Sequence, residues 1–138
     1  MIIKITPDKQ KSAALVAIAK ITLERLEKTE TERYPSNTLL DYYDIIHNLL
    51  EALTVQEGIK VKGEGAHQEL IEYVVKHYGF SEQTRQFLQQ LREYRNRISY
   101  EGFMVNLEFI RANTLKVEFI ITLLFQQIEK GHSTSSKP

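Results

Sequence analysis

The sequence predicts an all-α protein, an up-and-down bundle of four or five helices. Apolar residues recur at the three- and four-residue spacing of an amphipathic helix along most of the chain. Capping residues, prolines and glycines interrupt this pattern at intervals that fit separate helices. A strand pattern occurs only at residues 2–5, so a fold built on a sheet is not expected.

Length and composition indicate one globular domain. The chain has 138 residues, the size of a single domain, and can bury roughly two-thirds of its unfolded surface. Apolar residues make up 42% and charged residues 26%, so a disordered chain is not expected. We therefore assign residues 1–130 to one helical domain and expect the polar segment 131–138 to be a disordered tail.

Charge and residue usage exclude several classes of protein. The 18 Lys and Arg residues balance 18 Asp and Glu residues, which argues against a strongly basic nucleic-acid-binding protein but permits a local basic patch. The absence of cysteine excludes disulfides, thiolate nucleophiles and cysteine zinc sites. No apolar run reaches the ~18 residues of a membrane span, and residues 1–6 are too short for a signal peptide. We expect a cytoplasmic protein without membrane association or cofactor.

Two helices are predicted in the first part of the chain. The first follows the start signal Thr6-Pro7 and ends near Glu30. Its apolar stripe comprises Leu15, Ile18, Ala19, Thr22 and Leu26. The second is capped by Ser36 or Asn37 and is stopped by Gly58. Its apolar face comprises Leu39, Tyr42, Tyr43, Ile46, Leu49, Leu50 and Leu53.

A loop and three more helices complete the predicted bundle. The loop spans residues 58–65, where three of eight positions are glycine, and a short helix follows from His67 to Tyr78. Ser81 caps the fourth helix and Gly102 ends it. The fifth helix runs from near Asn106 to Lys130-Gly131. The core stripes of these two helices are Phe87, Leu91, Tyr94 and Ile98, and then Leu107, Ile110, Thr114, Val117, Ile121, Leu124 and Ile128.

The fifth helix also has a second apolar face. Leu115, Phe119 and Leu123, spaced at i, i+4 and i+8, lie on the side opposite its core stripe. A helix that is apolar on two sides is either central in its bundle or shared with another chain. We prefer the second interpretation, a homodimer whose interface includes these three residues.

Polar residues gather at the end of the fourth helix, in the segment 95–103. On a helical wheel Arg95 lies at the border of the core stripe, and Asn96 and Tyr100 lie on the side facing away from it. Arg92 and Ser99 lie between these positions. Cations near the C-terminus of a helix often serve only to complement its dipole. The alternative is that these side chains meet a partner or a ligand.

Arg95 and Asn96, followed by Tyr100, resemble the signature of the HEPN family (higher eukaryotes and prokaryotes nucleotide-binding domains). The family pattern is Arg, often Asn, three more residues and then His; Tyr100 stands at the histidine position. The order of elements before and after the signature is also similar, and the resemblance covers residues 39–130. It implies a small α-helical bundle that forms a homodimer, as in many metal-independent ribonucleases and toxins of toxin–antitoxin pairs.

The resemblance also implies roles for individual residues. In catalytic members the arginine holds the scissile phosphate and the histidine transfers protons, which assigns catalysis to Arg95, Asn96 and Tyr100. Phosphate or nucleotide binding would then involve Arg92, Arg95, Arg97 and Ser99, since paired N–H donors suit phosphate. A tyrosine titrates at about 10 and a histidine at about 6.5, so Tyr100 is a poor base at neutral pH.

Three functions are consistent with these residues. The first is a HEPN-like dimer that binds nucleotide or RNA phosphate, as a catalytically weakened or inactive toxin–antitoxin-type component or as the partner of a nucleotidyltransferase. The second is an active metal-independent endoribonuclease that uses Arg95 with Tyr100, or with a histidine such as His47 from the partner chain. The third is a non-catalytic helical interaction module.

The histidines have simpler interpretations when each is considered alone. His47 lies at the edge of an apolar stripe near Asp44 and Glu51, where it would bond a carboxylate. His67 is expected in a capping or loop position, and His77 lies in the last turn of its helix, where a cation is favoured. His132 falls in the expected tail. No His, Asp and Glu residues show metal-ligand spacing, so no metal site is expected.

Overall fold

Helices form nearly all of the structure, a computed structural model that describes residues 1–135. Residues 136–138, the end of the expected tail, lie outside the described part. The elements in chain order are β1 (Ile2–Lys4), α1 (Lys9–Glu27), the 3₁₀ turn η1 (Thr31–Arg33), α2 (Pro35–Gln56), β2 (Ile59–Val61), α3 (Ala66–Tyr78), α4 (Glu82–Glu101) and α5 (Leu107–Ser135). The predicted all-α bundle is thus confirmed, with one small antiparallel sheet added to it.

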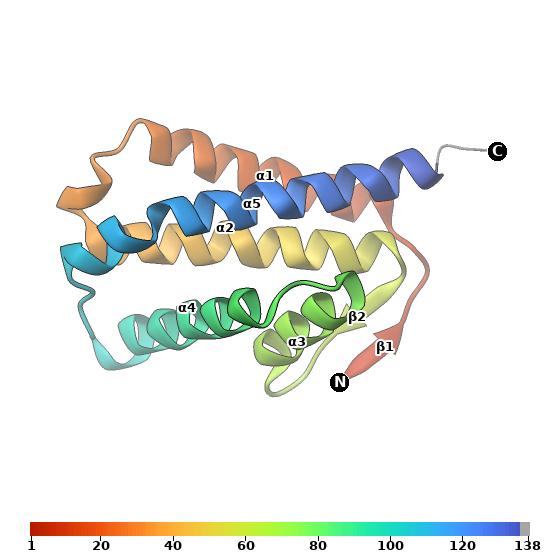
Figure 1. Cartoon of the computed structure of the whole chain (residues 1–138). Helices are drawn as coiled ribbons and strands as arrows, with labels where there is room; N and C mark the ends of the chain where they lie inside the picture. The colour runs from red at the N-terminus through yellow and green to blue at the C-terminus, as the bar shows by residue number, and fades with distance from the viewer. Residues whose placement is uncertain (136–138) are drawn as a thin grey trace.

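Helix α2 is the centre of the bundle. Figure 1 shows it between α1 and α5 on one side and α3 and α4 on the other, and it packs against all four. Leu39, Leu49 and Leu53 of the predicted stripe are fully buried. Ile45 and Ala52, which lie outside that stripe, are fully buried as well. The helix is therefore buried over a wider arc than its sequence stripe indicated, because helices cover it from two sides.

Local capping signals explain several helix ends. Ser81 accepts a hydrogen bond from the Thr84 N–H at 3.1 Å and starts α4, as predicted. Gly79 and Gly102 close α3 and α4 in the left-handed conformation, also as predicted. Asp8, rather than Thr6, caps α1 by accepting a hydrogen bond from the Lys11 N–H at 2.9 Å.

The predicted start of α2 is wrong by a few residues. The helix begins at Pro35, and its N-cap residue, Tyr34, makes no side-chain capping bond. The hydroxyl of Ser36 instead accepts a hydrogen bond from the Val105 N–H at 3.0 Å. Ser36 therefore connects the start of α2 to the segment that precedes α5. This long-range hydrogen bond replaces the expected local cap.

Part of the predicted glycine-rich loop is a strand. Residues 59–61 form β2, which pairs antiparallel with β1 and places Ile2 opposite Val61. Gly58 makes the entry to this strand, with a positive φ of 84°. A Cβ at Gly58 would lie 2.6 Å from the carbonyl oxygen of Ile5, so the close approach of the two segments requires glycine here.

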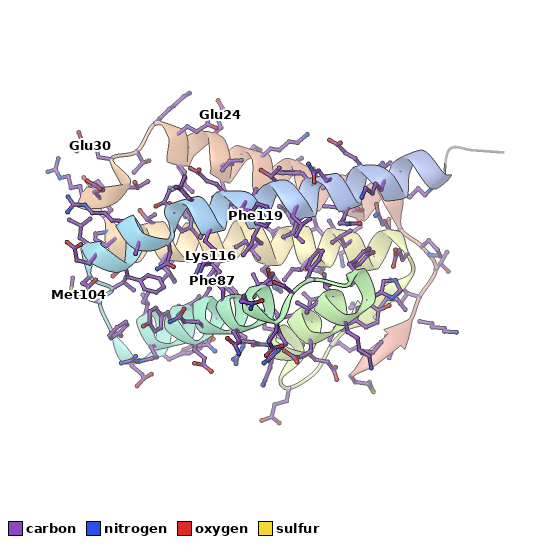
Figure 2. The ribbon with its side chains drawn as sticks, viewed as in Figure 1. Glu24, Glu30, Phe87, Met104, Lys116 and Phe119 are labelled. Carbon is purple, nitrogen blue, oxygen red and sulfur yellow. The ribbon has the colours of Figure 1, made fainter. Side chains whose placement is uncertain are left out.

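Helix α5 extends further than predicted and lies at the edge of the bundle. It continues to Ser135, one turn beyond the expected end, so the first part of the expected tail is helical. Leu115 and Phe119 are 80% and 65% exposed, and Leu123 is half-buried. The interpretation that α5 is the central helix is therefore wrong. In Figure 2, Lys116 points from α5 toward Phe87 of α4, with its ammonium 4.8 Å from the ring centroid.

The same helices bear on the expectation about membranes. Within residues 1–135, none of the helices combines the length and the apolar character that crossing a bilayer requires.

Candidate functional site

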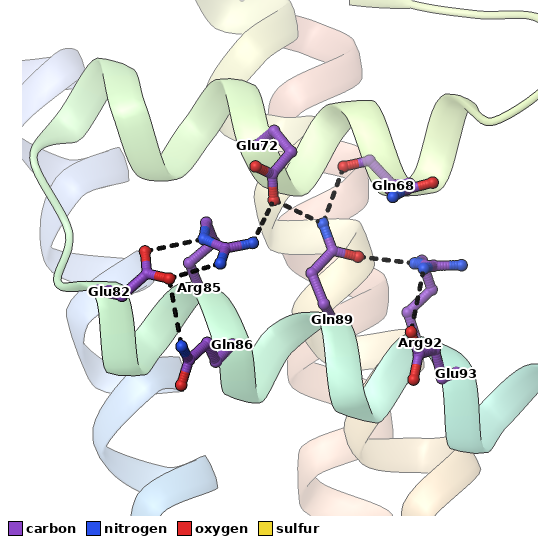
Figure 3. A network of polar contacts seen from close by, with 8 residues as sticks. All are labelled: Gln68, Glu72, Glu82, Arg85, Gln86, Gln89, Arg92 and Glu93. Carbon is purple, nitrogen blue, oxygen red and sulfur yellow. Dashed lines mark hydrogen bonds and ion pairs between the residues drawn. The ribbon is translucent and has the colours of Figure 1, made fainter.

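A polar network joins α3 to α4 along the side of α4 that leads to Arg95. Figure 3 shows Arg85 and Gln89 of α4 both reaching Glu72 of α3, at 3.3 and 2.8 Å. The Gln89 amide also donates to the backbone carbonyl of Gln68 at 3.1 Å, and its oxygen accepts from Arg92 at 2.7 Å. These bonds hold the N-terminal half of α3 against α4. Asn96, which the helical wheel had placed on an open face, is half-buried.

Arg95 lies between two tyrosine rings. The centre of its guanidinium is 5.7 Å from the ring centroid of Tyr43 on α2 and 5.9 Å from that of Tyr100. It donates a hydrogen bond to the side-chain oxygen of Asn96 at 3.1 Å. Among the described residues Arg95 forms no salt bridge, so its charge is available to an anion. The structure therefore brings together the three residues assigned to catalysis, and Tyr100 is 76% exposed.

Two histidines adjoin this group. The rings of His47 on α2 and His67 on α3 stack with centroids 4.1 Å apart and planes 22° from parallel. The Tyr43 hydroxyl and His67 Nδ1 are hydrogen-bonded at 2.9 Å, so Tyr43 contacts Arg95 with its ring and His67 with its hydroxyl. The sequence placed each histidine correctly on its element. It carried no signal that they would meet each other and Arg95.

The charges of this cluster are set by burial and by the arginines. Burial, followed by electrostatic repulsion from the His67 imidazole when it is protonated and from Arg95, lowers the pKa of His47 to about 4. Burial and Arg95 also lower the pKa of His67. Burial raises the pKa of Tyr43 to about 12, although Arg95 and Arg92 oppose the shift. At neutral pH both imidazoles and the phenol are therefore uncharged, and the arginines remain as the cations of the site.

Carboxylates limit how basic the site is. The Glu51 carboxylate lies 3.7 Å from His47 Nε2, which confirms that this histidine has a carboxylate neighbour. Asp44 is exposed as a residue, but neighbouring groups partly desolvate its carboxyl and raise its pKa, and Arg95 opposes that shift. The site therefore contains both signs of charge, and among its side chains Arg92 and Arg95 favour an anion.

A cavity and a helix end lie beside the histidines. The cavity has a volume of about 210 Å³ and is lined by His47, Glu51, Thr54, Val55, Lys60, Val61, Ala66, His67 and Leu70. Helix α3 begins next to it, and its N-cap residue, Gly65, supplies no side-chain cap. An N-terminus of this kind carries a partial positive charge, which favours an anion, and its first N–H, that of Ala66, is hydrogen-bonded to the Gly63 carbonyl oxygen at 3.2 Å.

The other residues assigned to phosphate binding differ in position. Arg92 belongs to the cluster and is hydrogen-bonded to Gln89. Arg97 lies over the ring of Phe103, 3.9 Å from its centroid, and its Nε is 4.0 Å from a Glu101 carboxylate oxygen. Ser99 is exposed. The structure thus brings Arg92 together with Arg95 and does not bring Arg97 to them.

The remaining histidine of α3 lies outside the site. His77 Nε2 is 3.3 Å from the Glu57 carboxylate, and its ring stacks on Tyr73. His67, by contrast, was expected to cap or to lie in a loop, and instead bonds Tyr43 from the first turn of α3. Among residues 1–135 no group of three His, Asp or Glu residues gathers in a way that could hold a metal ion.

Comparison with known proteins adds no assignment. No family model matches the chain, and no curated protein or solved structure matches it. The likeness to HEPN domains rests on the residues quoted above.

The buried state of His47 predicts a loss of stability in mild acid. The unfolded chain binds a proton at His47 below a pH of about 6.5, whereas the folded chain excludes it until about pH 4. Stability is therefore lost as the pH falls through this window, by about 2–3 kcal/mol for His47 alone. Urea unfolding at neutral and mildly acidic pH measures the loss. Between these two pH values, the free energy of unfolding of His47→Gln should fall by about 2–3 kcal/mol less than that of the wild type.

His77→Gln is the control for this experiment, because His77 is exposed. Its free energy of unfolding should fall with pH as that of the wild type does. If the free energy of unfolding of His47→Gln fell in parallel with that of the wild type, His47 would not be held neutral in the folded protein.

Proposed function

We propose that this protein is a HEPN-like RNA-phosphate-binding domain. It acts as a homodimer and binds a phosphodiester through Arg95 and Arg92. The observation that carries the proposal is the setting of Arg95. It is half-buried beside two aromatic rings and forms no salt bridge within residues 1–135. A preorganised guanidinium of this kind binds phosphate with charge-assisted hydrogen bonds.

Comparison with other arginines of the bundle supports this role. Arg85 lies between the carboxylates of Glu72 and Glu82, and Arg111 is held by Glu32 at 2.8 Å. Those arginines serve contacts within the fold. Arg95 instead contacts two aromatic rings and an amide, and within residues 1–135 no carboxylate, Asp44 included, forms a salt bridge with it.

The exposed Tyr100 ring favours single-stranded RNA over a free phosphate. Aromatic side chains beside a cationic groove stack on unpaired bases with little sequence preference, and each such contact contributes about 1–3 kcal/mol. Tyr100 is 76% exposed and adjoins the Arg95 guanidinium. The proposal therefore assigns Tyr100 to base stacking. The cellular role proposed with it is that of a toxin–antitoxin-type component or the partner of a nucleotidyltransferase.

A second candidate function is metal-independent cleavage of RNA. Such a reaction needs a neutral base near the ribose hydroxyl and a cation near the phosphate. The stacked pair of His47 and His67, uncharged at neutral pH and next to Arg95, supplies both kinds of group. This observation favours the candidate even though Tyr100 replaces the signature histidine.

Binding of a labelled single-stranded RNA, measured by fluorescence anisotropy in chelator and at low salt, tests the proposal. Arg95→Ala should weaken binding about 10- to 100-fold, because it removes charge-assisted hydrogen bonds to phosphate. Arg111→Ala is the matched control, a surface arginine engaged by Glu32, and should bind like the wild type. Wild-type protein that does not bind RNA, or Arg95→Ala that binds equally well, would leave only a helical interaction module.

A further inference from the structure

We infer that His67 is the proton-transfer residue of this site, held in place by Tyr43 and acting on the ribose 2′-hydroxyl of a bound RNA strand. The inference rests on the proposed RNA-binding function and makes that site catalytic. It also places the acid–base group in the same chain as Arg95. The site then needs neither the Tyr100 hydroxyl nor a histidine from a second protomer.

The geometry fixes one ring nitrogen of His67 and leaves the other available. Nδ1 is hydrogen-bonded to the buried Tyr43 hydroxyl at 2.9 Å, and His47 covers one face of the ring at a centroid distance of 4.1 Å. In the tautomer that base catalysis needs, Nδ1–H donates to the phenol oxygen. Nε2 then carries the lone pair and can accept a proton. Tyr43 is thus a positioning residue, because it orients the ring without touching the substrate.

His67 suits the role better than the other candidates nearby. His47 lies close to the Glu51 carboxylate, and its pKa of about 4 makes it a weak base. Tyr100 is a phenol, and a phenol is a poor base at neutral pH. The pKa of His67 is lowered by burial and by Arg95, so its ring is neutral at neutral pH in the free protein. The charged or titratable groups that act on it are Arg92, Arg95, Asp44, Glu51 and His47.

The reaction is an internal transfer at phosphorus. Nε2 of His67 takes the proton of the 2′-hydroxyl, O2′ forms a bond to phosphorus, and the bond from phosphorus to O5′ breaks. Arg95 stabilises the negative charge on the non-bridging oxygens. The departing O5′ takes a proton from water, and His67 returns its proton to solvent. The products are a 2′,3′-cyclic phosphate end and a 5′-hydroxyl end, and no metal or oxidant takes part.

The test uses the full chain with a labelled single-stranded RNA in chelator. His67→Asn keeps a side-chain amide that can bond Tyr43 but cannot accept a proton, so cleavage should fall about 100-fold or more. RNA binding should stay within about threefold of the wild type, since the arginines remain. His77→Asn, the other histidine of α3, is the matched control and should cleave like the wild type.

Two further measurements do not depend on the folding of the His67 variant. An RNA with a 2′-deoxy sugar at the cleaved position should bind to the wild type and resist cleavage. The rate of RNA cleavage by the wild type should decline in acid as His67 takes up a proton. Tyr43→Phe should slow cleavage and also shift the pH at which this decline occurs. A Tyr43→Phe variant whose profile is unchanged would exclude Tyr43 as the residue that positions His67.

The outcomes separate this inference from the function on which it rests. Wild-type protein that binds RNA through Arg95 but does not cleave it overturns the role of His67 and leaves the binding function intact. Cleavage that survives in His67→Asn overturns it as well. Protein that does not bind RNA at all removes the proposed function itself.

Discussion

Leu49→Ala is expected to lower the free energy of unfolding by about 2–5 kcal/mol, the usual cost of removing a fully buried leucine side chain. Leu49 has no exposed surface and lies in the middle of α2. Because four helices pack around α2, the neighbours of Leu49 are fixed from two sides of the bundle and cannot all move to fill the space. The free-energy cost of the cavity left by the substitution therefore adds to the lost free energy of burying the leucine side chain.

Urea unfolding followed by circular dichroism measures this change. Ile21→Ala is the matched control, since Ile21 is an aliphatic residue on α1 that is 66% exposed. It should alter the free energy of unfolding by no more than about 0.5 kcal/mol. Comparable losses in the two variants would mean that α2 is not the centre of the core.

The helix ends that were predicted correctly are those set by local chemistry. Ser81 caps α4 with its own hydroxyl, and Gly102 ends it with a positive φ, so a few adjacent residues determine both boundaries. Ser36 resembles Ser81 as a capping residue but bonds Val105 instead. That partner is 69 residues away, and the sequence around Ser36 contains no sign of it.

The strand pattern at residues 2–5 is confirmed by β1, whereas the second strand of the small sheet was missed for a related reason. Ile59, Lys60 and Val61 form only a three-residue strand among glycines, which is typical of a loop when considered alone. The strand exists because β1 reaches it from the N-terminus of the chain. Pairing over such a distance in the sequence leaves no periodic pattern to recognise.

The candidate site could be predicted only in part. Arg95 and Asn96 are adjacent on α4 and Tyr100 lies about one turn further along, so their proximity follows from spacing alone. The addition of His67 depends on α3 lying along α4, which the contacts of Glu72 with α4 maintain. The sequence therefore identified the arginine side of the site and missed its imidazole side.

Phe119→Glu is expected to convert a homodimer into a monomer, the second large effect. Phe119 and Leu115 lie one turn apart on α5, and both are exposed, so together they form an apolar ridge on this helix. The bundle gains nothing from their exposure, because apolar side chains in water contribute no burial energy. A second copy of the chain that covers the ridge would supply this burial energy. Removing an aromatic side chain at the centre of an interface commonly costs about 2–4 kcal/mol of binding free energy.

Sedimentation at micromolar concentration distinguishes the outcomes. Phe119→Glu should sediment as a monomer that keeps its helical fold, since its side chain is outside the core. Ile21→Glu places the same charge on an exposed apolar position of α1 and should stay dimeric if α5 alone forms the interface. A wild type that is monomeric throughout would show that the ridge meets no second copy. His67 and Arg95 belong to one chain, so the cleavage proposed for them would then persist in the monomer.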